Sequence, residues 1–244
     1  MPETNPALQD ADIVDLQNQQ QTIELVSASI LGLWEVVNNL TRLRPTRRDR
    51  FRVTIFGSAR VSPDHWVYGA VRDLATELTG MGCTIVTGGG PGLMQAANEG
   101  ATLAGPDGPG QSMGIRVELP FEQDVNPFVG SAFEHRTFFS RLHHFVLVSD
   151  AFVVVPGGIG TVLELMLVWQ LLQVRKLSHT PLILVGPMWQ GLVDWHRQVM
   201  RRPEFELASD EDMAIPQVVP GAPEALAILR ERHAAWLSAG GLSR

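Results

Sequence analysis

From Arg52 onward, short runs of apolar and β-branched residues alternate with longer segments whose apolar residues recur at helical spacing. Strands are predicted in RVTIFGSAR, CTIVTGGG, SMGIRVEL, DAFVVVPGG and PLILVGP, and in a late segment around MAIPQVV. Most of these runs lack the alternation of a half-exposed strand, which is typical of a parallel sheet covered on both faces. The pattern therefore predicts an α/β fold with a Rossmann-like, doubly wound and mostly parallel sheet.

The segments between these runs predict helices. One is expected from about Pro63 to Gly80, and its apolar face consists of Trp66, Val67, Val71, Leu74 and Leu78. The next is expected in PGLMQAANEGATLAG, with Pro91 in its first turn. Others are expected in FFSRLHHFVLVS, from about Thr161 to Val174, in WQGLVDWHRQVM and from Pro223 onward.

Residues 1–50 have a different pattern and predict an N-terminal helical extension with an arginine-rich linker. The Rossmann-like domain is then expected over residues 51–244. Apolar residues of the extension are spaced 3-4-3-4-3, at Ile23, Val26, Ile30, Leu33, Val37 and Leu40. This spacing is the a/d seam of a coiled coil. The helix could pack on a partner subunit or on its own domain, and the spacing favours neither.

The expected bounds of this helix come from residues that flank the seam. Leu16 extends the seam by one heptad, Asp10 or Asp12 could cap the first turn, and Pro45 ends the helix near Leu43. The arginines that follow, in TRLRPTRRDR, are typical of a solvated linker, with a site for phosphates or an acidic partner as the alternative.

Composition narrows the classes of function. The 244 residues include 19 Lys+Arg and 26 Asp+Glu, a net charge of −7, and 45% are hydrophobic, as in ordinary soluble proteins. Mild acidity argues against a nucleic-acid binder, and no apolar run reaches the roughly 18–20 residues that span a bilayer. The polar start, MPETNPALQD, is unlike a secretory signal. These features predict a cytoplasmic protein that binds neither nucleic acid nor membrane.

Few residues suit metal or cofactor chemistry. The single cysteine, Cys83, excludes an internal disulfide and a Cys-rich metal site. His143 and His144 are adjacent, but no third ligand lies at metal spacing, so a structural role is expected. The single lysine, Lys176, lies at a predicted helix end and is a poor candidate for the Schiff base of a pyridoxal-phosphate enzyme. We therefore expect no metal and no cofactor.

Two glycine-rich loops follow predicted strands, at the positions where parallel sheets bind ligands. The first runs from Thr87 to Met94 and the second from Pro156 to Thr161. Glycines let the backbone approach an anion, and the free amides of a helix start attract it. Leu93 and Leu163 stand where a dinucleotide fingerprint needs glycine, and neither loop has the Gly-Lys-Ser/Thr of a P-loop. Two such loops, taken to follow neighbouring strands, predict a bound phosphate.

Glu164 lies one helical turn beyond Gly160 and is expected to project near the second loop. A carboxylate beside a phosphate is unfavourable unless it has a task or a partner. Arg141 is a candidate partner that would keep the carboxylate ionised. The alternatives are a helix-start acid for Glu164, favoured by the helix dipole, and a surface charge for Arg141. The spacing does not decide between these interpretations.

The segments TGGGPGLMQAANEGA and PGGIGTVLE together resemble the LOG family, whose signature is PGGxGTxxE. Residues 156–164 match every fixed position, the similarity covers about residues 52–200, and the FGSAR opening is similar to the longer-chain branch. The resemblance implies a phosphoribohydrolase, which hydrolyses the N-glycosidic bond of nucleoside 5′-monophosphates, cytokinin ribotides among them, to free base and ribose 5-phosphate. It implies that Arg141 and Glu164 are the catalytic pair. It also implies that the nucleotide and its phosphate contact Gly57, Ser58, Gly88, Gly89, Gly90, Met94, Gly157, Gly158, Gly160 and Thr161.

The chain departs from the family pattern in two places. Leu142 follows Arg141 where the family has lysine, and Gln95 stands where longer relatives often have glutamate. The missing positive charge bears on turnover and substrate range. Molybdenum-cofactor carrier proteins are similar to this family and hold a phosphorylated pterin without hydrolysis. A non-catalytic carrier of a phosphorylated small molecule is therefore the main alternative, and a nucleotide-sensing regulator is a further one. The resemblance also implies a homodimer or larger homo-oligomer.

Overall fold

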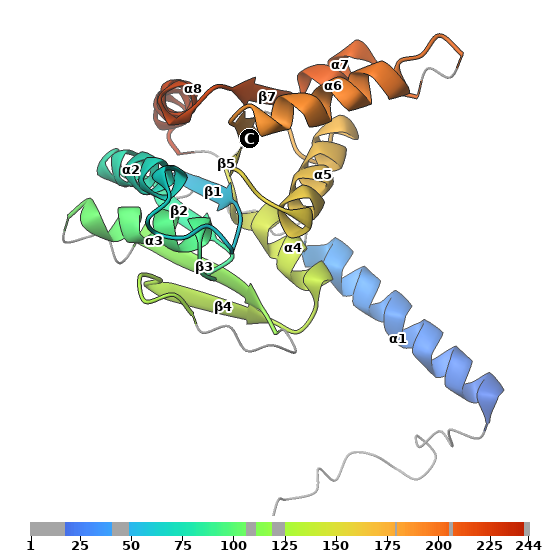
Figure 1. Ribbon diagram of the computed structural model, residues 1–244. Coiled ribbons are helices and arrows are strands. Elements are labelled where there is room, and N and C mark those ends of the chain that lie inside the picture. The colour runs from blue at the N-terminus through green and yellow to red at the C-terminus, as the bar shows by residue number, and fades with distance from the viewer. Residues whose placement is uncertain are drawn as a thin grey trace, which may run out of the picture. The chain divides into compact units, whose positions relative to one another are not determined.

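The computed structural model describes residues 18–40, 49–105, 111–118, 125–178, 180–204 and 207–241. The chain divides into two units, Met1–Pro45 and Thr46–Arg244. The first unit contains the helix α1 (Gln19–Leu40). The second contains a sheet with helices on both faces (Figure 1).

A parallel sheet forms the centre of the second unit. Its strands are β1 (Arg52–Phe56), β2 (Thr84–Thr87), β3 (Ser112–Val117), β4 (Ser131–His135), β5 (Ala151–Val154), β6 (Leu182–Val185) and β7 (Pro216–Val219). The order across the sheet is β4-β3-β2-β1-β5-β6-β7, and every neighbouring pair is parallel. The carboxyl ends of all these strands therefore meet at one edge of the sheet. The predicted Rossmann-like, doubly wound fold is confirmed.

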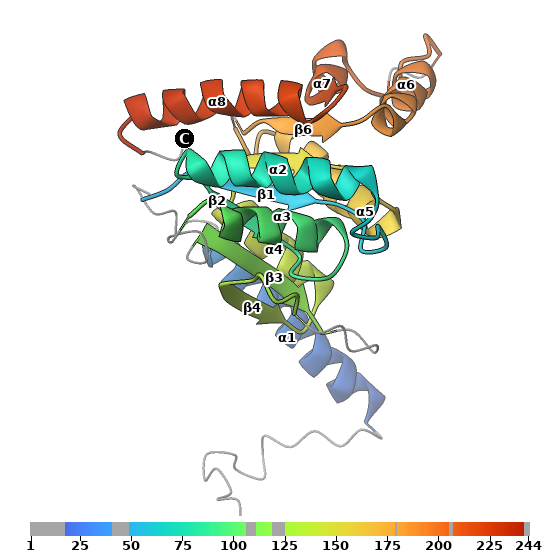
Figure 2. The same ribbon diagram turned by 60° about the vertical axis from the view of Figure 1, so that its left-hand side comes forward.

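Two layers of helices cover the sheet (Figures 1 and 2). The helices of the second unit are α2 (Trp66–Gly80), α3 (Leu93–Leu103), α4 (Phe138–Val148), α5 (Ile159–Gln173), α6 (Met188–Met200), α7 (Asp210–Ala214) and α8 (Ala222–Ser238). Residues of α2, α3 and α8 share one buried cluster with the strands. Residues of α4, α5, α6 and α7 share a second cluster with the same strands.

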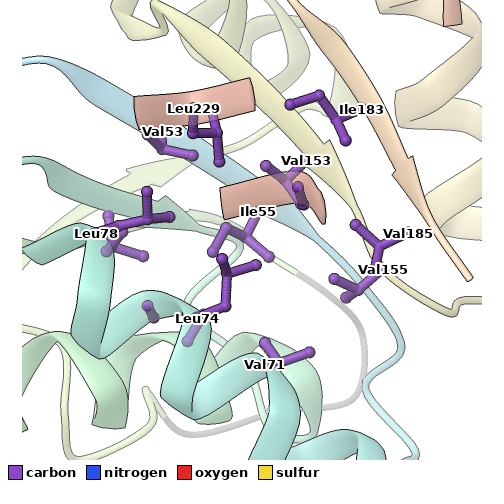
Figure 3. Packing of buried hydrophobic residues seen from close by; sticks show 14 of the residues in the cluster. Val53, Ile55, Val71, Leu74, Leu78, Val153, Val155, Ile183, Val185 and Leu229 are labelled. Atoms are coloured by element: carbon purple, nitrogen blue, oxygen red, sulfur yellow. The ribbon is translucent and has the colours of Figure 1, made fainter. Parts of the chain in front are cut away.

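The two clusters explain why the strands are apolar at nearly every position. In β1, Val53 and Ile55 pack with α2, α3 and α8, whereas Phe56 packs with α4 and α5. Figure 3 shows Val53 and Ile55 beside Leu74 of α2 and Leu229 of α8. Alternate residues of a strand point to opposite faces, so a sheet buried on both sides needs continuous apolar runs.

Three local predictions about these elements were wrong. Trp66 is 77% exposed instead of packed with Val67, because it is the first residue of α2 and lies about 100° around the helix from Val67. Pro91 precedes α3, because Gly92, with φ of 70°, is the residue that caps this helix. Met213 and Ala214 belong to α7, and the late strand begins only at Pro216.

The sheet differs from the expected one in two further respects. The sequence pattern does not predict β4, because four of its five residues are exposed and leave no buried apolar run. The two glycine loops follow β2 and β5, which are not neighbours as expected, because β1 lies between them. The FGSAR segment at the end of β1 therefore stands between the two loops.

The helix of the N-terminal unit begins at Gln19. Ile23, Val26, Ile30 and Leu33 of its seam are all at least half exposed. The other predicted features lie outside the described residues: Asp10, Asp12, Leu16, Leu43, Pro45 and the side chains of Val37 and Leu40. Packing of the seam on a partner or on its own domain stays a prediction. Among the helices that the structure describes, none is long and apolar enough to cross a membrane.

Candidate functional site

A cavity of about 950 Å³ lies where the carboxyl ends of β1, β2, β3 and β5 meet the helix starts. Ten residues predicted to form the site line it: Gly57, Ser58, Gly88, Gly90, Met94, Arg141, Gly158, Gly160, Thr161 and Glu164. The predicted Gly89 and Gly157 are not among its lining residues. Gly89 lies against the side chain of Arg116, and Gly157 lies against the side chain of Thr161. Both therefore support the wall from behind.

The first glycine loop packs tightly against the end of β1. The amide of Leu93 donates to the carbonyl of Ser58 over 2.8 Å. Gly92 has φ of 70°, and a Cβ at this position would overlap the backbone of Ser58 and Ala59. Both its conformation and its surroundings require glycine. The loop and the FGSAR segment consequently form one continuous wall of the cavity.

The second loop places the N-terminus of α5, which no described side chain caps and which we call its bare start, at the cavity. Gly158 is the residue that precedes the helix, and no side-chain hydrogen bond caps this end among the residues that the structure describes. The first amides of a helix have no partner within the helix, and the dipole makes this end partly positive. Gly158, Gly160 and Thr161 line the cavity. This corner of the cavity is suited to an anion such as a phosphate.

Arg141 of α4 and Glu164 of α5 form an ion pair at the wall of the cavity. The Nη1 atom of Arg141 lies 3.1 Å from Oε1 of Glu164, and each side chain is 11% exposed. Arg141 also donates from Nε to the carbonyl of Ile115 over 2.9 Å. Its guanidinium lies 5.1 Å from the ring centroid of Phe145. Arg141 is therefore not a surface charge, and Glu164, which lies beyond the first turn of α5, is not a helix-start acid but has the partner that its position requires.

Burial changes the proton affinity of this carboxyl. Burial raises the pKa of Glu164 from 4.5 to about 7, although the positive charge of Arg141 acts in the opposite direction. The sequence interpretation expects Arg141 to keep this carboxylate ionised. The effect of burial is larger than that of the Arg141 charge, so the carboxyl is partly protonated at neutral pH. A carboxyl that exchanges its proton near neutrality, in a cavity and beside a cation, is typical of acid–base catalysis.

Of the two histidines that follow Leu142, His144 contacts another histidine, and Nε2 of His143 is buried without a hydrogen-bond partner among the described residues. His144 lies 2.9 Å from His135 of β4 through ring nitrogens. Burial, followed by the neighbouring charges of His135 and Arg52, lowers the pKa of His144 to about 4, so its ring is neutral at physiological pH. No group of three or more His, Cys, Asp or Glu suited to a metal occurs within the part of the chain that the structure describes.

The cavity is also lined by residues that the sequence interpretation missed. They are Ala59, Arg60, Arg116, Val117, Glu118, Glu134, Phe138 and Ile159. Arg116 of β3 pairs with Glu134 of β4 over 3.5 Å. The rule that ligands bind at strand ends could have found Arg60 in FGSAR and Arg116 in SMGIRVEL. Glu134 had no such signal, because its strand was not predicted.

Comparisons with known proteins relate the chain to one family. A family model described as "Possible lysine decarboxylase" matches residues 94–229, more than half of the chain. The pyrimidine/purine nucleotide 5′-monophosphate nucleosidase of Escherichia coli (strain K12) is 28% identical over 146 residues, which cover 55% of this chain and 31% of that protein. The protein of the same description from Escherichia coli O157:H7 matches equally. The chain thus spans about a third of the length of these relatives.

Solved structures share the fold at lower identity. The molybdenum cofactor carrier protein from Chlamydomonas reinhardtii matches with a TM-score of 0.54 and 18% identity, covering 76% of this chain and 99% of its own. The molybdenum cofactor binding protein from Rippkaea orientalis matches with a TM-score of 0.53 and 17% identity, covering 75% of this chain and 97% of its own. At these identities the likeness establishes the fold alone.

Proposed function

The chain belongs to the family described as "Possible lysine decarboxylase", the LOG family that its motifs predict, and from this premise we propose that it is a nucleoside 5′-monophosphate phosphoribohydrolase. The observation that carries the proposal is the buried pair of Arg141 and Glu164, placed in one cavity with the bare start of α5. The similarity to a nucleotide 5′-monophosphate nucleosidase supports the same reaction.

The proposed binding mode follows from the residues that line the cavity. The 5′-phosphate lies on the amides of Gly158 and Gly160 and on the hydroxyl of Thr161, where the helix dipole favours negative charge. The ribose then lies beside the ion pair, and the base points toward Arg116, Glu134 and Phe138. Charged and aromatic groups of this kind suit a polar, planar base.

In the proposed reaction the C1′–N bond of the nucleotide breaks and its electron pair leaves with the base. Positive charge develops at C1′, and the Glu164 carboxylate stabilises it. Water adds its oxygen to C1′, one of its protons passes to Glu164, and the departing base takes up a proton from solvent. Arg141 remains protonated throughout, orients the carboxylate and holds it in place.

Decarboxylation of lysine is not the reaction that we propose, despite the description of the family. A pyridoxal-phosphate decarboxylase needs a lysine in the site to form its Schiff base. The single lysine of this chain, Lys176, is exposed beyond the end of α5 and is not among the residues that line the cavity.

The proposal is tested by incubating the purified protein with AMP, GMP, CMP, UMP and isopentenyladenosine monophosphate, and by separating free base from nucleotide by chromatography. We expect base release that falls at least 1000-fold in Glu164→Gln, because the variant keeps the shape of the side chain but cannot carry its charge. Glu77→Gln is the matched control, since Glu77 pairs with Arg230 on the exposed surface. Release from the isopentenylated nucleotide would add a cytokinin-activating role.

The same experiment tests the alternative of a non-catalytic carrier. Absence of base release from every nucleotide, in a protein that is folded, would contradict the hydrolase. Tight binding of a phosphorylated pterin without turnover would then support the carrier, in line with the fold shared with molybdenum cofactor carrier proteins. The proposed homodimer or larger homo-oligomer is measured separately, by light scattering of the intact chain.

A further inference from the structure

Two asparagines that do not line the cavity lie behind its first glycine loop. Asn98 of α3 is fully buried. Its Oδ1 accepts from the hydroxyl of Thr87 over 2.6 Å and from Nδ2 of Asn126 over 3.0 Å. Its Nδ2 donates to the hydroxyl of Ser112 over 2.9 Å. Asn98 thus joins the end of β2, the start of β3 and the segment that contains Asn126.

Asn126 extends this network to the loop itself. Its side chain is 5% exposed, and Nδ2 also donates to the carbonyl of Gly90 over 2.9 Å. Its backbone amide donates to the carbonyl of Gly89 over 3.0 Å. The amide of Gly89 in turn donates to the hydroxyl of Thr87 over 2.9 Å. Two carbonyls of the loop are therefore fixed by hydrogen bonds from Asn126, and one amide is fixed by the side chain of Thr87.

The loop fixed in this way lies directly against the ion pair. A Cβ at Gly88 would overlap the guanidinium of Arg141 and would lie 2.6 Å from the sulfur of Met94. Gly88 is thus in close contact with the same guanidinium that holds Glu164. A shift of the loop toward the cavity would displace Arg141, and a shift away from it would leave the guanidinium unsupported on that side.

We propose that Asn98 and Asn126 are positioning residues, which hold the first glycine loop so that Gly88 keeps Arg141 against Glu164. This proposal rests on the proposed function for its effect on turnover, but not for its effect on the loop. Neither asparagine touches the substrate. Small misplacements of a catalytic group cost large factors in rate, up to roughly 100-fold for 1 Å, so a support of this kind should be visible in kinetics.

The test variant is Asn126→Asp, which keeps the volume of the side chain and the acceptor for the amide of Phe128. It replaces the donating Nδ2 by an oxygen that faces two acceptors, the carbonyl of Gly90 and Oδ1 of Asn98. We expect kcat with AMP to fall about 10- to 100-fold, with KM changed less than threefold. The low-pH limb of the pH–kcat profile should move to higher pH. The positive charge of Arg141 lowers the pKa of Glu164, and this pKa rises when Arg141 moves away.

Hydrogen exchange of the peptide that covers residues 87–94 supplies a readout that does not need turnover. We expect faster exchange there in Asn126→Asp, with the rest of the sheet unchanged. Thr54→Val is the matched control: it removes a buried hydroxyl pair between Thr54 and Ser149 and should lower the melting temperature without altering kcat or exchange of the loop. If Asn126→Asp does not fold, Thr87→Val should give the same lower kcat and faster exchange of the loop. Thr87→Ser, which keeps the hydroxyl, should behave like the wild type.

The outcomes separate the two proposals. Unchanged exchange of residues 87–94 in folded Asn126→Asp would overturn the assignment, whatever the activity. Faster exchange with unchanged kcat and an unchanged pH limb would overturn the link from the loop to Arg141. A wild-type protein that releases no base would contradict the proposed function, while the exchange experiment would still decide whether the asparagines hold the loop.

Discussion

The two glycine loops of the cavity look alike in sequence but are held in different ways. The loop after β2 is fixed by buried side chains, because Thr87 and Asn126 bond to its backbone and Asn98 bonds to both of these side chains. The loop after β5 leads into a helix start that no side-chain hydrogen bond caps in the described structure. In the first loop the amide of Gly89 and the carbonyls of Gly89 and Gly90 are bonded within the protein, whereas the second loop leaves the amides of a helix start for a ligand.

This difference assigns a separate task to each loop. A backbone whose amides and carbonyls are already bonded is a rigid wall, and the first loop supports the guanidinium of Arg141. A helix start with free amides attracts an anion, and the second loop suits the phosphate. Glycine content alone therefore does not distinguish the two loops, and we propose that their hydrogen-bond partners show which of them holds the phosphate.

Among variants of the two glycine loops, the largest effect is expected from Gly88→Ala. The added methyl would overlap the guanidinium of Arg141 and the sulfur of Met94, both of which are ends of long side chains, so the fold should survive while Arg141 moves. We expect kcat for AMP to fall about 100-fold or more, with a far-ultraviolet circular dichroism spectrum like that of the wild type. A kcat within threefold of the wild type would contradict the role of this loop as a support.

The buried carboxyl should make stability depend on pH. Between pH 4.5 and about 7 the folded state holds the proton of Glu164 and the unfolded state releases it, so the free energy of unfolding falls as pH rises. Relative to Glu164→Gln, the loss is expected to be about 3 kcal/mol across this range, since one pKa unit corresponds to about 1.4 kcal/mol. Urea unfolding of both proteins at several pH values measures it. If the free energy of unfolding depends on pH in the same way in both proteins, burial does not raise the pKa of Glu164.

In the second loop, Thr161→Ala should weaken binding more than chemistry. The hydroxyl would bond to the phosphate in the ground state and the transition state alike, so its loss is expected to raise KM for AMP about tenfold with little change in kcat. Steady-state kinetics at fixed ionic strength separates the two constants. Unchanged KM and kcat would place the phosphate elsewhere, and a loss confined to kcat would show that the hydroxyl acts only in the transition state.

The smallest effect is expected from Gly158→Ala, the counterpart of Gly88→Ala. No atom lies within 4 Å of the added methyl, and the backbone conformation does not require glycine. The free protein should therefore keep its melting temperature within about 1 °C. A several-fold rise in KM is expected, because the methyl restricts the approach of the phosphate. A large loss of stability would mean that this loop is packed like the first one.

Sequence patterns predict the fold well where residues are buried on both sides, and less well at exposed edges. The continuous run in DAFVVV gives β5, but Ser131–His135 of β4 lies at an edge with mixed polarity and has no such signal. The resemblance to the LOG motifs predicts Arg141 and Glu164 as a pair, and helical spacing predicts that Glu164 lies near the second loop. The structure has both residues in one ion pair. The raised pKa of Glu164 depends on burial by residues distant in sequence, which spacing does not reveal.

The network behind the first loop is beyond sequence analysis for a similar reason. Asn98 and Asn126 are 28 positions apart, and the chain between them includes a complete strand. A single asparagine in a helix pattern or a loop is compatible with an exposed side chain. Only the parallel arrangement of β2 and β3 brings both amides beneath Gly89 and Gly90.

The dependence of kcat on pH tests the central claim, that the carboxylate of Glu164 drives hydrolysis, most directly. Measured with saturating AMP between pH 5.5 and 9, kcat should rise with pH and level off, because burial raises the pKa of Glu164 and only its ionised form stabilises the charge at C1′. A kcat that is constant over this range, or that falls as pH rises through 7, would contradict the account.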